Sequence, residues 1–504
     1  MINKIDKSLN NIKSSVAVIG SGFAGLSAAS VLSAAGLDVT VYEKNPTIGG
    51  RARIFEDEGF KFDMGPSWYW MPDVYERYFN LFGHTTSDFY ELKKLDPGFR
   101  VIFGKDDFVD VPENFDQLCA LFEKIEPNSA SRLKRFMLQA EYKYNIGMDK
   151  MVYQPGLSVK EFFDLKLMKD VFKLQVFSSF SDHIRSYFKD PRLIAIMEFP
   201  VLFLGAMPKD TPALYSLMNY AGLRQGTFYP MGGFGKVIGA FSRIAAEAGV
   251  RIKTSENVER LELKSDAISH LHSNGNAAEV NAVMATSDYH HTEQALLPES
   301  YRSYNKAYWE KKIFAPSCLI FYLGISKKVA RLSHHNLFFD ENFHAHAVEI
   351  YKTKKWPEKP LFYVCCPSKT DATVAPEGCE NIFVLMPVAA GLNDSEEKRE
   401  YYYDLLMGRL EKFTGEKIKD HVIYKKSYSV SNFENDYNAY KGNAYGLANT
   451  LFQTAIFKPR IRSSKVRNLF FAGQLTVPGP GVPPSIISGQ VAAKELLKSL
   501  KTSK

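Results

Sequence analysis

Residues 16–44 have the pattern of a strand, a glycine turn, a helix and a second strand that ends in an acid. Gly20, Gly22 and Gly25 have the G-x-G-x-x-G spacing, and Glu43 follows Gly22 by 21 residues. In such a unit the glycines permit a tight turn, close approach of a pyrophosphate and close helix packing, while the acid binds ribose hydroxyls. Amides at the helix start face the phosphates. The pattern predicts a dinucleotide-binding βαβ unit; the alternative is a tight turn in an unrelated α/β domain.

The size and composition of the chain indicate a globular protein with more than one core. Its 504 residues are long for a single hydrophobic core, so we expect two interleaved domains. The net charge of +7 is compatible with an anionic membrane surface but too weak to indicate nucleic acid, so no nucleic acid partner is predicted. Aromatic residues make up 13% of the chain, which suits either a large apolar cavity or a Phe-rich core.

Several classes of protein are disfavoured by what the sequence does not contain. The five cysteines lack the paired spacing of zinc sites or disulfide frameworks, and no histidine pair has a recognisable third ligand, so we predict reduced thiols and no metal. The N-terminal segment lacks the apolar region of a signal peptide. No stretch reaches the roughly 18 apolar residues of a membrane span. We therefore expect a cytoplasmic protein that could still lie on the inner face of the cell membrane.

The remaining patterns divide the chain into interleaved parts. A glycine turn, a helix and strands after Gly226 look like a continuation of the first unit, and a strand, a Pro/Gly loop and a helix close the chain. Helical patterns dominate residues 76–224, and apolar runs after Ser317 predict a mixed or antiparallel sheet. We predict a discontinuous dinucleotide-binding domain of residues 14–75, 226–290 and 455–504. A substrate-binding and membrane-associating domain would then contain residues 76–225 and 291–454.

Further segments carry a resemblance to a known family. A GGR turn at Gly49 and a C-terminal FAG strand resemble the amine oxidase and phytoene desaturase superfamily of FAD enzymes. Within it, FDMGPSWYWMP, FYPMGGFGKVIGAF and AGQLTVPGPGVPPSIISG resemble the bacterial-type phytoene desaturases of carotenoid synthesis. The resemblance covers about Ser15 to Leu500, and it implies an α/β fold in which a Rossmann-like FAD-binding domain is interleaved with a mixed-sheet and helical substrate domain.

The resemblance also implies which residues hold FAD. The glycines of the first turn would hold the pyrophosphate, Glu43 the ribose and Val258 the adenine, while Arg51 would offset phosphate charge. Many relatives have Asp where this chain has Gln474, which leaves the hydrogen bond there open. Alternatively, Arg51 is a surface charge, Val258 packs in the core, and Gln474 is oriented away from the cofactor. The full set of expected cofactor contacts is Gly20, Ser21, Gly22, Phe23, Ala24, Gly25, Glu43, Lys44, Gly50, Arg51, Gly65, Pro66, Ser67, Val258, Gly473, Gln474, Gly481, Val482 and Pro483.

The C-terminal loop has a physical argument of its own. Its prolines stiffen the backbone, and Pro483 and Pro484 lie where a helix begins, a position that suits proline. We expect this helix, from about Ser485, to point its positive end at the flavin and to stabilise negative charge there. The alternative is a rigid loop with no cofactor contact.

The implied activity is desaturation of a carotenoid C–C bond by hydride transfer to FAD, most simply the conversion of phytoene to lycopene. Oxygen or a quinone would accept the electrons, and the substrate would enter from the membrane. The segments at residues 158–180 and from Glu198 would line a tunnel, dock on the bilayer or simply pack in the core. No catalytic residue is assigned, because Asp63, Glu198 and Asp210 fit structural roles better. Alternatives are a desaturase or isomerase of another, for example hydroxylated, carotene, an amine oxidase, and a non-catalytic lipid carrier on the same scaffold.

Overall fold

A parallel five-stranded sheet forms one half of the molecule. In the computed structural model, which describes residues 14–158, 161 and 174–502, its strand order is β19-β13-β1-β2-β9. Four of these strands are mostly buried runs of apolar residues, as expected for a sheet covered on both faces, whereas the edge strand Arg251–Lys253 is largely exposed. The strands are β1 (Ser15–Ile19), β2 (Asp38–Tyr42), β9 (Arg251–Lys253), β13 (Ala282–Ala285) and β19 (Leu469–Phe471).

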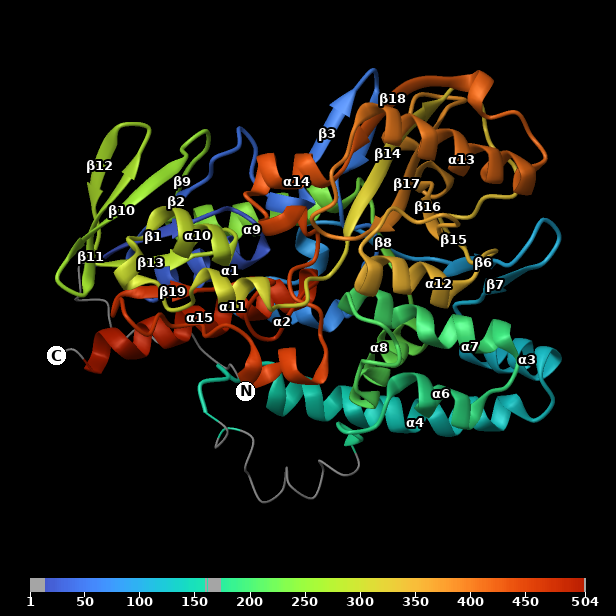
Figure 1. The fold of residues 1–504 in the computed structure, drawn as a ribbon, viewed down its shortest axis with the longest axis horizontal. Coiled ribbons are helices and arrows are strands. Elements are labelled where there is room, and N and C mark those ends of the chain that lie inside the picture. Colours follow the sequence, from blue (N-terminus) through green and yellow to red (C-terminus); the bar gives the residue numbers. More distant parts are fainter. Residues whose placement is uncertain (1–13, 159–160, 162–173, 503–504) are drawn as a thin grey trace.

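Helices from distant parts of the chain cover this sheet. α1 (Phe23–Ala34) packs against both α9 (Phe234–Glu247) and the C-terminal α15 (Val482–Thr502). α15 approaches so closely that a Cβ added at Gly489 would lie 2.3 Å from the carbonyl oxygen of Ala24. The two ends of the chain therefore meet in one domain (Figure 1). α10 (Tyr289–Leu296) follows β13, and a small antiparallel sheet flanks it, formed by β10 (Val258–Lys264), β11 (Ala267–Ser273) and β12 (Asn276–Glu279).

A seven-stranded mixed sheet forms the other half, in the order β18-β14-β17-β16-β15-β6-β7. Only the β15–β6 pair is parallel, and α13 (Glu396–Thr414) packs its tyrosines and leucines on one face. The strands are β6 (Phe99–Ile102), β7 (Phe108–Val111), β14 (Ser317–Ile325), β15 (His335–Phe338), β16 (Phe362–Cys365), β17 (Glu380–Val388) and β18 (Val422–Tyr428).

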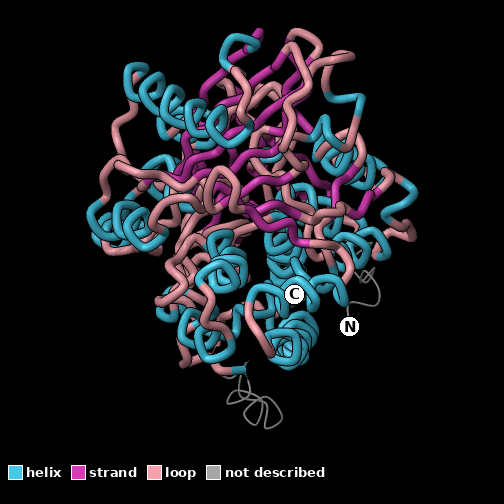
Figure 2. Tube along the Cα trace, turned by 90° about the vertical axis from the view of Figure 1, so that its right-hand side faces the viewer, coloured by secondary structure: helices cyan, strands magenta, loops and turns pink. Residues whose placement is uncertain are grey.

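A helical layer lies below this sheet, and Figure 2 shows most helices beneath the strands. No helix of the described residues is long and apolar enough to cross a membrane. The α-helices not yet named, in this layer and elsewhere, are α2 (Pro72–Asn80), α3 (Phe115–Ile125), α4 (Ser129–Ile146), α6 (Phe180–Tyr187), α7 (Pro191–Glu198), α8 (Leu217–Tyr220), α11 (Lys306–Glu310), α12 (Phe343–Val348) and α14 (Val430–Tyr437).

Short elements complete the fold. Two-stranded sheets pair β3 (Ile54–Asp57) with β4 (Phe60–Asp63), and β5 (Leu92–Lys94) with β8 (Phe228–Pro230). Single turns of π or 3-10 helix are η1 (Gly50–Ala52), η2 (Thr86–Asp88), η3 (Gly147–Met151), η5 (Phe199–Leu204), η6 (Ala213–Ser216), η7 (Ala221–Gln225), η8 (Glu299–Tyr301), η9 (Glu349–Thr353), η10 (Pro367–Lys369), η11 (Ala372–Val374), η12 (Lys419–His421), η13 (Tyr440–Gly442), η14 (Leu451–Gln453) and η15 (Ala455–Phe457).

The predicted fold class is confirmed: a Rossmann-like domain is interleaved with a mixed-sheet and helical part. The exact domain ranges 14–75, 226–290, 455–504 and 76–225, 291–454 stay a prediction. The segment 158–180, predicted to line a tunnel, dock on the bilayer or pack in the core, lies mostly outside the described residues. The last helix begins at Val482 rather than at Ser485, because both prolines fit into its first turn.

Candidate functional site

The first glycine turn connects β1 to α1 and needs glycine at two of its three glycine positions. Gly20 has φ +100°, and its amide donates to the carbonyl oxygen of Tyr42. A Cβ at Gly25 would lie 2.0 Å from the carbonyl oxygen of Gly20, so no side chain fits there. Gly22 caps α1 without a side chain. The amides at the start of α1 therefore face an open space that suits an anion.

Glu43 stands at the end of β2 and organises the rim of this space. Its side chain is 4% exposed. One carboxylate oxygen accepts from the amide and hydroxyl of Ser21 at 3.0 and 2.7 Å, and the other accepts from the amide and side chain of Asn45 at 2.9 Å. The carboxylate thus ties the glycine turn to the end of β2, and Glu43 lines the cavity beside them.

The GGR turn approaches the first turn closely. A Cβ at Gly50 would lie 3.2 Å from the Cα of Gly22. Arg51 donates to the carbonyl oxygen of Asn443 at 3.2 Å and lies over the ring of Tyr437, but its buried Nε has no hydrogen-bond partner. Burial lowers the pKa of Arg51, with Asp288 opposing that effect. A buried guanidinium with a free donor in a cavity is suited to hold an anion.

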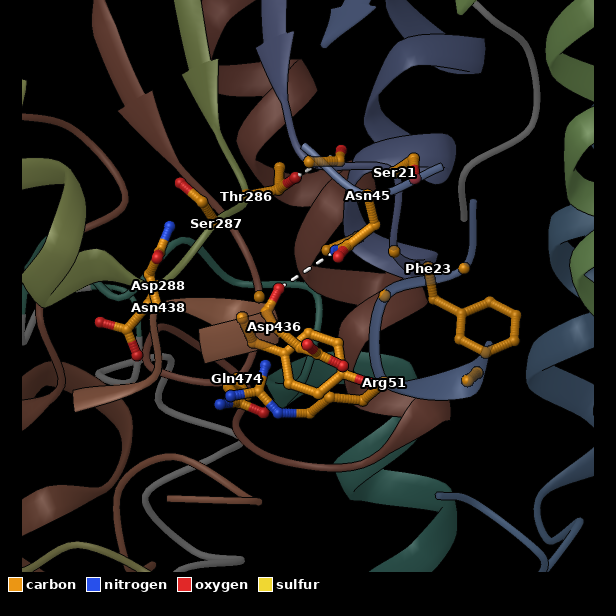
Figure 3. A pocket seen from close by; sticks show the side chains of 18 of the residues that line it. Ser21, Phe23, Asn45, Arg51, Thr286, Ser287, Asp288, Asp436, Asn438 and Gln474 are labelled. Carbon is orange, nitrogen blue, oxygen red and sulfur yellow. Dashed lines mark hydrogen bonds between the residues drawn. The ribbon is translucent and has the colours of Figure 1, made fainter. Parts of the chain in front are cut away.

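Two further groups of residues meet here that the sequence analysis did not assign. Thr286, Ser287 and Asp288 follow β13, so they lie at the same sheet edge as the first glycine turn, and Asp436 and Asn438 come from the end of α14 (Figure 3). The polar run after a predicted parallel strand was a usable signal for the first group. For α14 the sequence carries no such signal.

These residues enclose a cavity of about 260 Å³. All the predicted contacts except Gly25, Ser67 and Pro483 line it. Gly25 supports the turn from behind, whereas Ser67 and Pro483 line a second cavity. Phe23 turns its ring away from the cavity centre and packs edge-on against Phe241 (Figure 3). Lys44 reaches the cavity rim, but its ammonium is bound by the carbonyl oxygen of Asn435 and the side chain of Asn438.

The second cavity, of about 250 Å³, is apolar. None of the described residues that line it is Asp, Glu, Lys or Arg. The segment after Glu198 contributes Phe199, Leu202 and Met218, so this part of the predicted tunnel-or-membrane segment faces the cavity. The two cavities share wall residues, which are Gly65, Pro66, Leu385, Tyr445, Gly481 and Val482. The cavity beside the glycine turns and the apolar cavity therefore meet at the start of α15.

Comparisons with known proteins show the family of this chain. Residues 23–497 match the family described as flavin containing amine oxidoreductase. The chain belongs to this family. It is 39% identical over 486 residues to a carotenoid 3,4-desaturase of Haloarcula japonica, covering 96% of this chain and 98% of that protein. It is 29% identical to a zeta-carotene-forming phytoene desaturase of Myxococcus xanthus, over 96% of this chain and 93% of the relative.

Solved structures show the same fold at low sequence identity. An oxidoreductase from Methanosarcina mazei superimposes with a TM-score of 0.63 at 15% identity, over 95% of this chain and 100% of that one. A putrescine oxidase superimposes with a TM-score of 0.63 at 14% identity, over 97% and 99% of the two chains. The resemblance to a carotenoid desaturase within the flavin amine oxidoreductases is confirmed, and the cofactor is FAD.

The residues of the first cavity fit FAD. The unpartnered Nε of Arg51 and the close backbone of the two glycine turns, where Gly25 leaves no room for a Cβ, suit a pyrophosphate. Val258 is buried at the start of β10 and lines the same cavity. Gln474, at the position where many relatives have Asp, donates to the side chain of Asn443 at 3.3 Å while still lining the cavity. The individual roles given to these residues stay predictions.

The three carboxylates considered as bases occupy structural positions. Asp63 accepts hydrogen bonds from the amides of Phe234 and Gly235 at the start of α9, and burial raises its pKa to about 7. Glu198 is paired with Arg185 and Ser181. Asp210 is exposed. None of the three lines either described cavity, and their structural roles stay a prediction.

The five cysteines are free thiols, four of them buried. One histidine pair, however, has the third ligand-type side chain that the sequence analysis did not find. One atom each from His334, His335 and Cys365 lie within 4.8 Å of one another, because β15 and β16 pair His335 directly opposite Cys365. The expectation that the chain binds no metal stays a prediction.

Proposed function

We propose that this chain is an FAD-dependent carotenoid desaturase that converts phytoene to lycopene by successive desaturations. The observation that carries the proposal is the wall shared by the nucleotide cavity and the apolar cavity. A flavin at that wall would face a space suited to a long hydrocarbon. The name of the Myxococcus xanthus relative supports phytoene as the substrate.

The residues of the first cavity would bind and orient the cofactor. We infer that the start of α1 holds the pyrophosphate, Glu43 the ribose, and Arg51 the excess negative charge. When bound, FAD supplies the redox chemistry by accepting hydride from a C–H bond beside the polyene. α15 begins at the shared wall, and its positive end stabilises negative charge that develops there.

The apolar cavity would orient the substrate and exclude water. Trp68, Trp70 and Phe199 contribute aromatic faces, and the wall carries no charged side chain among the described residues. Loss of hydride leaves positive charge spread along the polyene, and aromatic faces attract such a cation without trapping it. The cavity therefore suits a carotenoid better than an amine.

A second candidate is introduction of a C3–C4 double bond into a carotenoid that is already conjugated. The 39% identity to the Haloarcula japonica 3,4-desaturase favours it, since the Myxococcus xanthus phytoene desaturase shares only 29% identity with this chain. Both candidates use the same cofactor and cavity. They differ in the length of conjugated chain that the cavity must accept.

We further propose that the protein works at the cytoplasmic face of the cell membrane, from which an insoluble carotenoid must enter. Oxygen or a quinone would take the electrons. Exposed aromatic side chains on η14 and η15 support a membrane-docking surface there.

The test is incubation of the purified chain with FAD and phytoene in liposomes, under air or with a quinone, followed by pigment chromatography. Lycopene is the expected product. Activity on lycopene or a hydroxylated carotene with none on phytoene would favour the second candidate. A protein that retains carotenoid unchanged, without bound flavin, would instead be a lipid carrier.

A further inference from the structure

A row of three hydrogen-bonded side chains runs from the wall of the apolar cavity into the protein. Ser67 Oγ lies 2.9 Å from Tyr363 Oη, and Tyr363 Oη lies 2.6 Å from His335 Nδ1. Ser67 and Tyr363 line the cavity, whereas His335 is fully buried behind them. Ser67 directly follows Gly65 and Pro66, which belong to the wall shared with the nucleotide cavity. The row thus begins where flavin and substrate would meet.

The surroundings of His335 fix the orientation of its ring and leave Nδ1 to accept a hydrogen bond from Tyr363. The indole of Trp68 stacks on the imidazole of His335 with centroids 4.0 Å apart and planes 10° apart. Its Nε2 is buried and has no hydrogen-bond partner in the described part of the chain. A phenol is the better donor and an imidazole nitrogen the better acceptor, so we assign Tyr363 as donor to Nδ1 and Ser67 as donor to Tyr363.

We propose that Tyr363 is the catalytic residue that takes the proton from the substrate carbon next to the one that loses hydride, and that His335 acts through it by accepting the phenol proton. This inference rests on the proposed function. It gives the reaction the proton acceptor that the carboxylates do not provide.

The atoms and electrons of this step balance. The C–H bond breaks, and its electron pair becomes the second bond of the new C=C. Tyr363 Oη gains the proton as it passes its own to His335 Nδ1, which leaves an imidazolium. The hydride carries two electrons to the flavin, and oxygen or a quinone finally takes these electrons with two protons, to give hydrogen peroxide or a quinol.

A weak base is sufficient for this step. Burial, and then the neighbouring His334, hold the pKa of His335 well below its ordinary value, so the ring is neutral and Nδ1 is free to accept. A C–H bond beside a delocalised cation is strongly acidic, so a neutral imidazole behind a phenol can remove its proton. A strong base would gain nothing here and would cost more to bury.

His346, which lines the apolar cavity itself, is not available for this role. His346 Nε2 lies 3.0 Å from the carbonyl oxygen of Pro387, and its Nδ1 accepts from the amide of Leu361 at 3.0 Å. Both nitrogens are therefore committed to the backbone. Among the described residues of the cavity wall, Tyr363 is distinguished by a hydroxyl backed by an acceptor with no other partner.

The test compares Tyr363→Phe and His335→Gln with Tyr90→Phe. The Gln side chain can accept the phenol hydrogen bond but cannot take up a proton. Tyr90 is a matched control, since its hydroxyl bonds that of Tyr69 at 2.8 Å, in the interior and away from both cavities. Substrate is deuterated in turn at each carbon of the reacting bond. We expect Y363F and H335Q to slow desaturation about 100-fold and to create an isotope effect at the proton-losing carbon, with Y90F like the wild type.

A second readout needs neither FAD nor activity. In histidine ¹⁵N NMR of the protein, Y363F should shift the Nδ1 resonance of His335, and Y90F should not. The proposal is overturned if Y363F keeps the wild-type rate and isotope pattern. It is also overturned if one zinc per chain co-purifies and is lost in H335Q, because a ligated ring could not take up the proton. Failure of the wild type to desaturate any carotenoid would instead count against the proposed function, while the NMR arm would still report the hydrogen bond.

Discussion

Gly25 is the residue at which the glycine turn tolerates least change. A Cβ there would lie 2.0 Å from the Gly20 carbonyl oxygen, which is backbone and cannot move aside. Gly25→Ala should lower the free energy of unfolding by about 1–3 kcal/mol or more and reduce bound flavin. Gly239→Ala is the control, because Gly239 is exposed on α9 with nothing within 4 Å; this change should stabilise by about 1 kcal/mol. Thermal unfolding and flavin absorbance measure both, and equal behaviour of the two variants would contradict the argument.

Arg51 is expected to act through its charge toward the cofactor. Its Nε is buried and lacks a hydrogen-bond partner, so an anion that enters the cavity would supply the missing acceptor. Arg51→Gln should weaken FAD binding about 10- to 100-fold, since a charge-assisted hydrogen bond is worth about 1.5–3 kcal/mol. Titration of apoprotein with FAD gives the dissociation constant. The control Arg243→Gln, on the exposed face of α9, should leave the dissociation constant unchanged. If R51Q also leaves it unchanged, the role assigned to Arg51 is wrong.

Single site residues could be predicted from the sequence wherever the backbone conformation accepts one residue type alone. Gly20 and Gly25 could be predicted because only glycine fits, and Glu43 because it ends the second strand. The partners of Glu43 were not predictable in the same way: its carboxylate holds Ser21 and Asn45 rather than standing free. Asp436 was not predicted, because no motif near it in the sequence indicates that it lines the cavity.

Elements were predictable where burial follows from local composition. β14 and β17 are continuous apolar runs and pair along their whole length, as expected for central strands. α15 extends three residues further toward the cavity than predicted, because Pro483 and Pro484 continue the helix at its start rather than precede it. This difference matters functionally, since it brings the end of the helix to the shared wall.

α10 carries a pH-sensitive contact. Glu293 is fully buried, accepts from the amides of Ser303 and Tyr304, and has its pKa raised to about 7, chiefly by burial. Because the folded protein then holds this proton more tightly than the unfolded chain, its contribution to stability is complete below pH about 4.5 and is lost as the pH rises through about 7.

Glu293→Gln removes this titration. The melting temperature of the wild type, taken relative to E293Q, should therefore fall as the pH rises from about 5 to about 8. Glu299→Gln, at an exposed position on η8, should follow the wild type at each pH. Parallel pH profiles of the wild type and E293Q would show that Glu293 does not titrate in this range.

The site as a whole needs segments that local patterns cannot bring together. The nucleotide cavity uses both ends of the chain, the end of β13 and the end of α14. The shared wall adds Leu385 from β17 and Tyr445 from a loop. Motif resemblance predicted the two ends, but the middle segments depend on how the seven-stranded sheet packs against the first domain, which composition and periodicity do not specify.

An exposed apolar patch gives the whole molecule a candidate membrane face. Phe452 is 74% and Phe457 48% exposed, with ring centroids 6.0 Å apart on η14 and η15. Leu157 is 36% exposed, and its neighbour Gly156 packs against Ala455 of η15. Clustered exposed aromatics mark interaction surfaces more often than scattered ones do. Since a carotenoid must enter from lipid, we expect this patch to insert into the bilayer interface.

The double variant Phe452→Ser/Phe457→Ser should lose most of its binding to liposomes. Each phenylalanine buried in the bilayer interface contributes about 1.5–3 kcal/mol, so the loss of both should lower the partition coefficient by more than about tenfold. Tyr401→Ser is the control, since Tyr401 is 60% exposed on α13, at the opposite edge of the view in Figure 1. Flotation on vesicles with and without anionic lipid measures the bound fraction, and the net charge of +7 predicts stronger binding to the anionic ones. FAD content should be equal in all three proteins, which separates docking from folding. If the double variant floats as well as the wild type does, the protein meets its lipid through another surface, and the entry route to the apolar cavity has to be sought there.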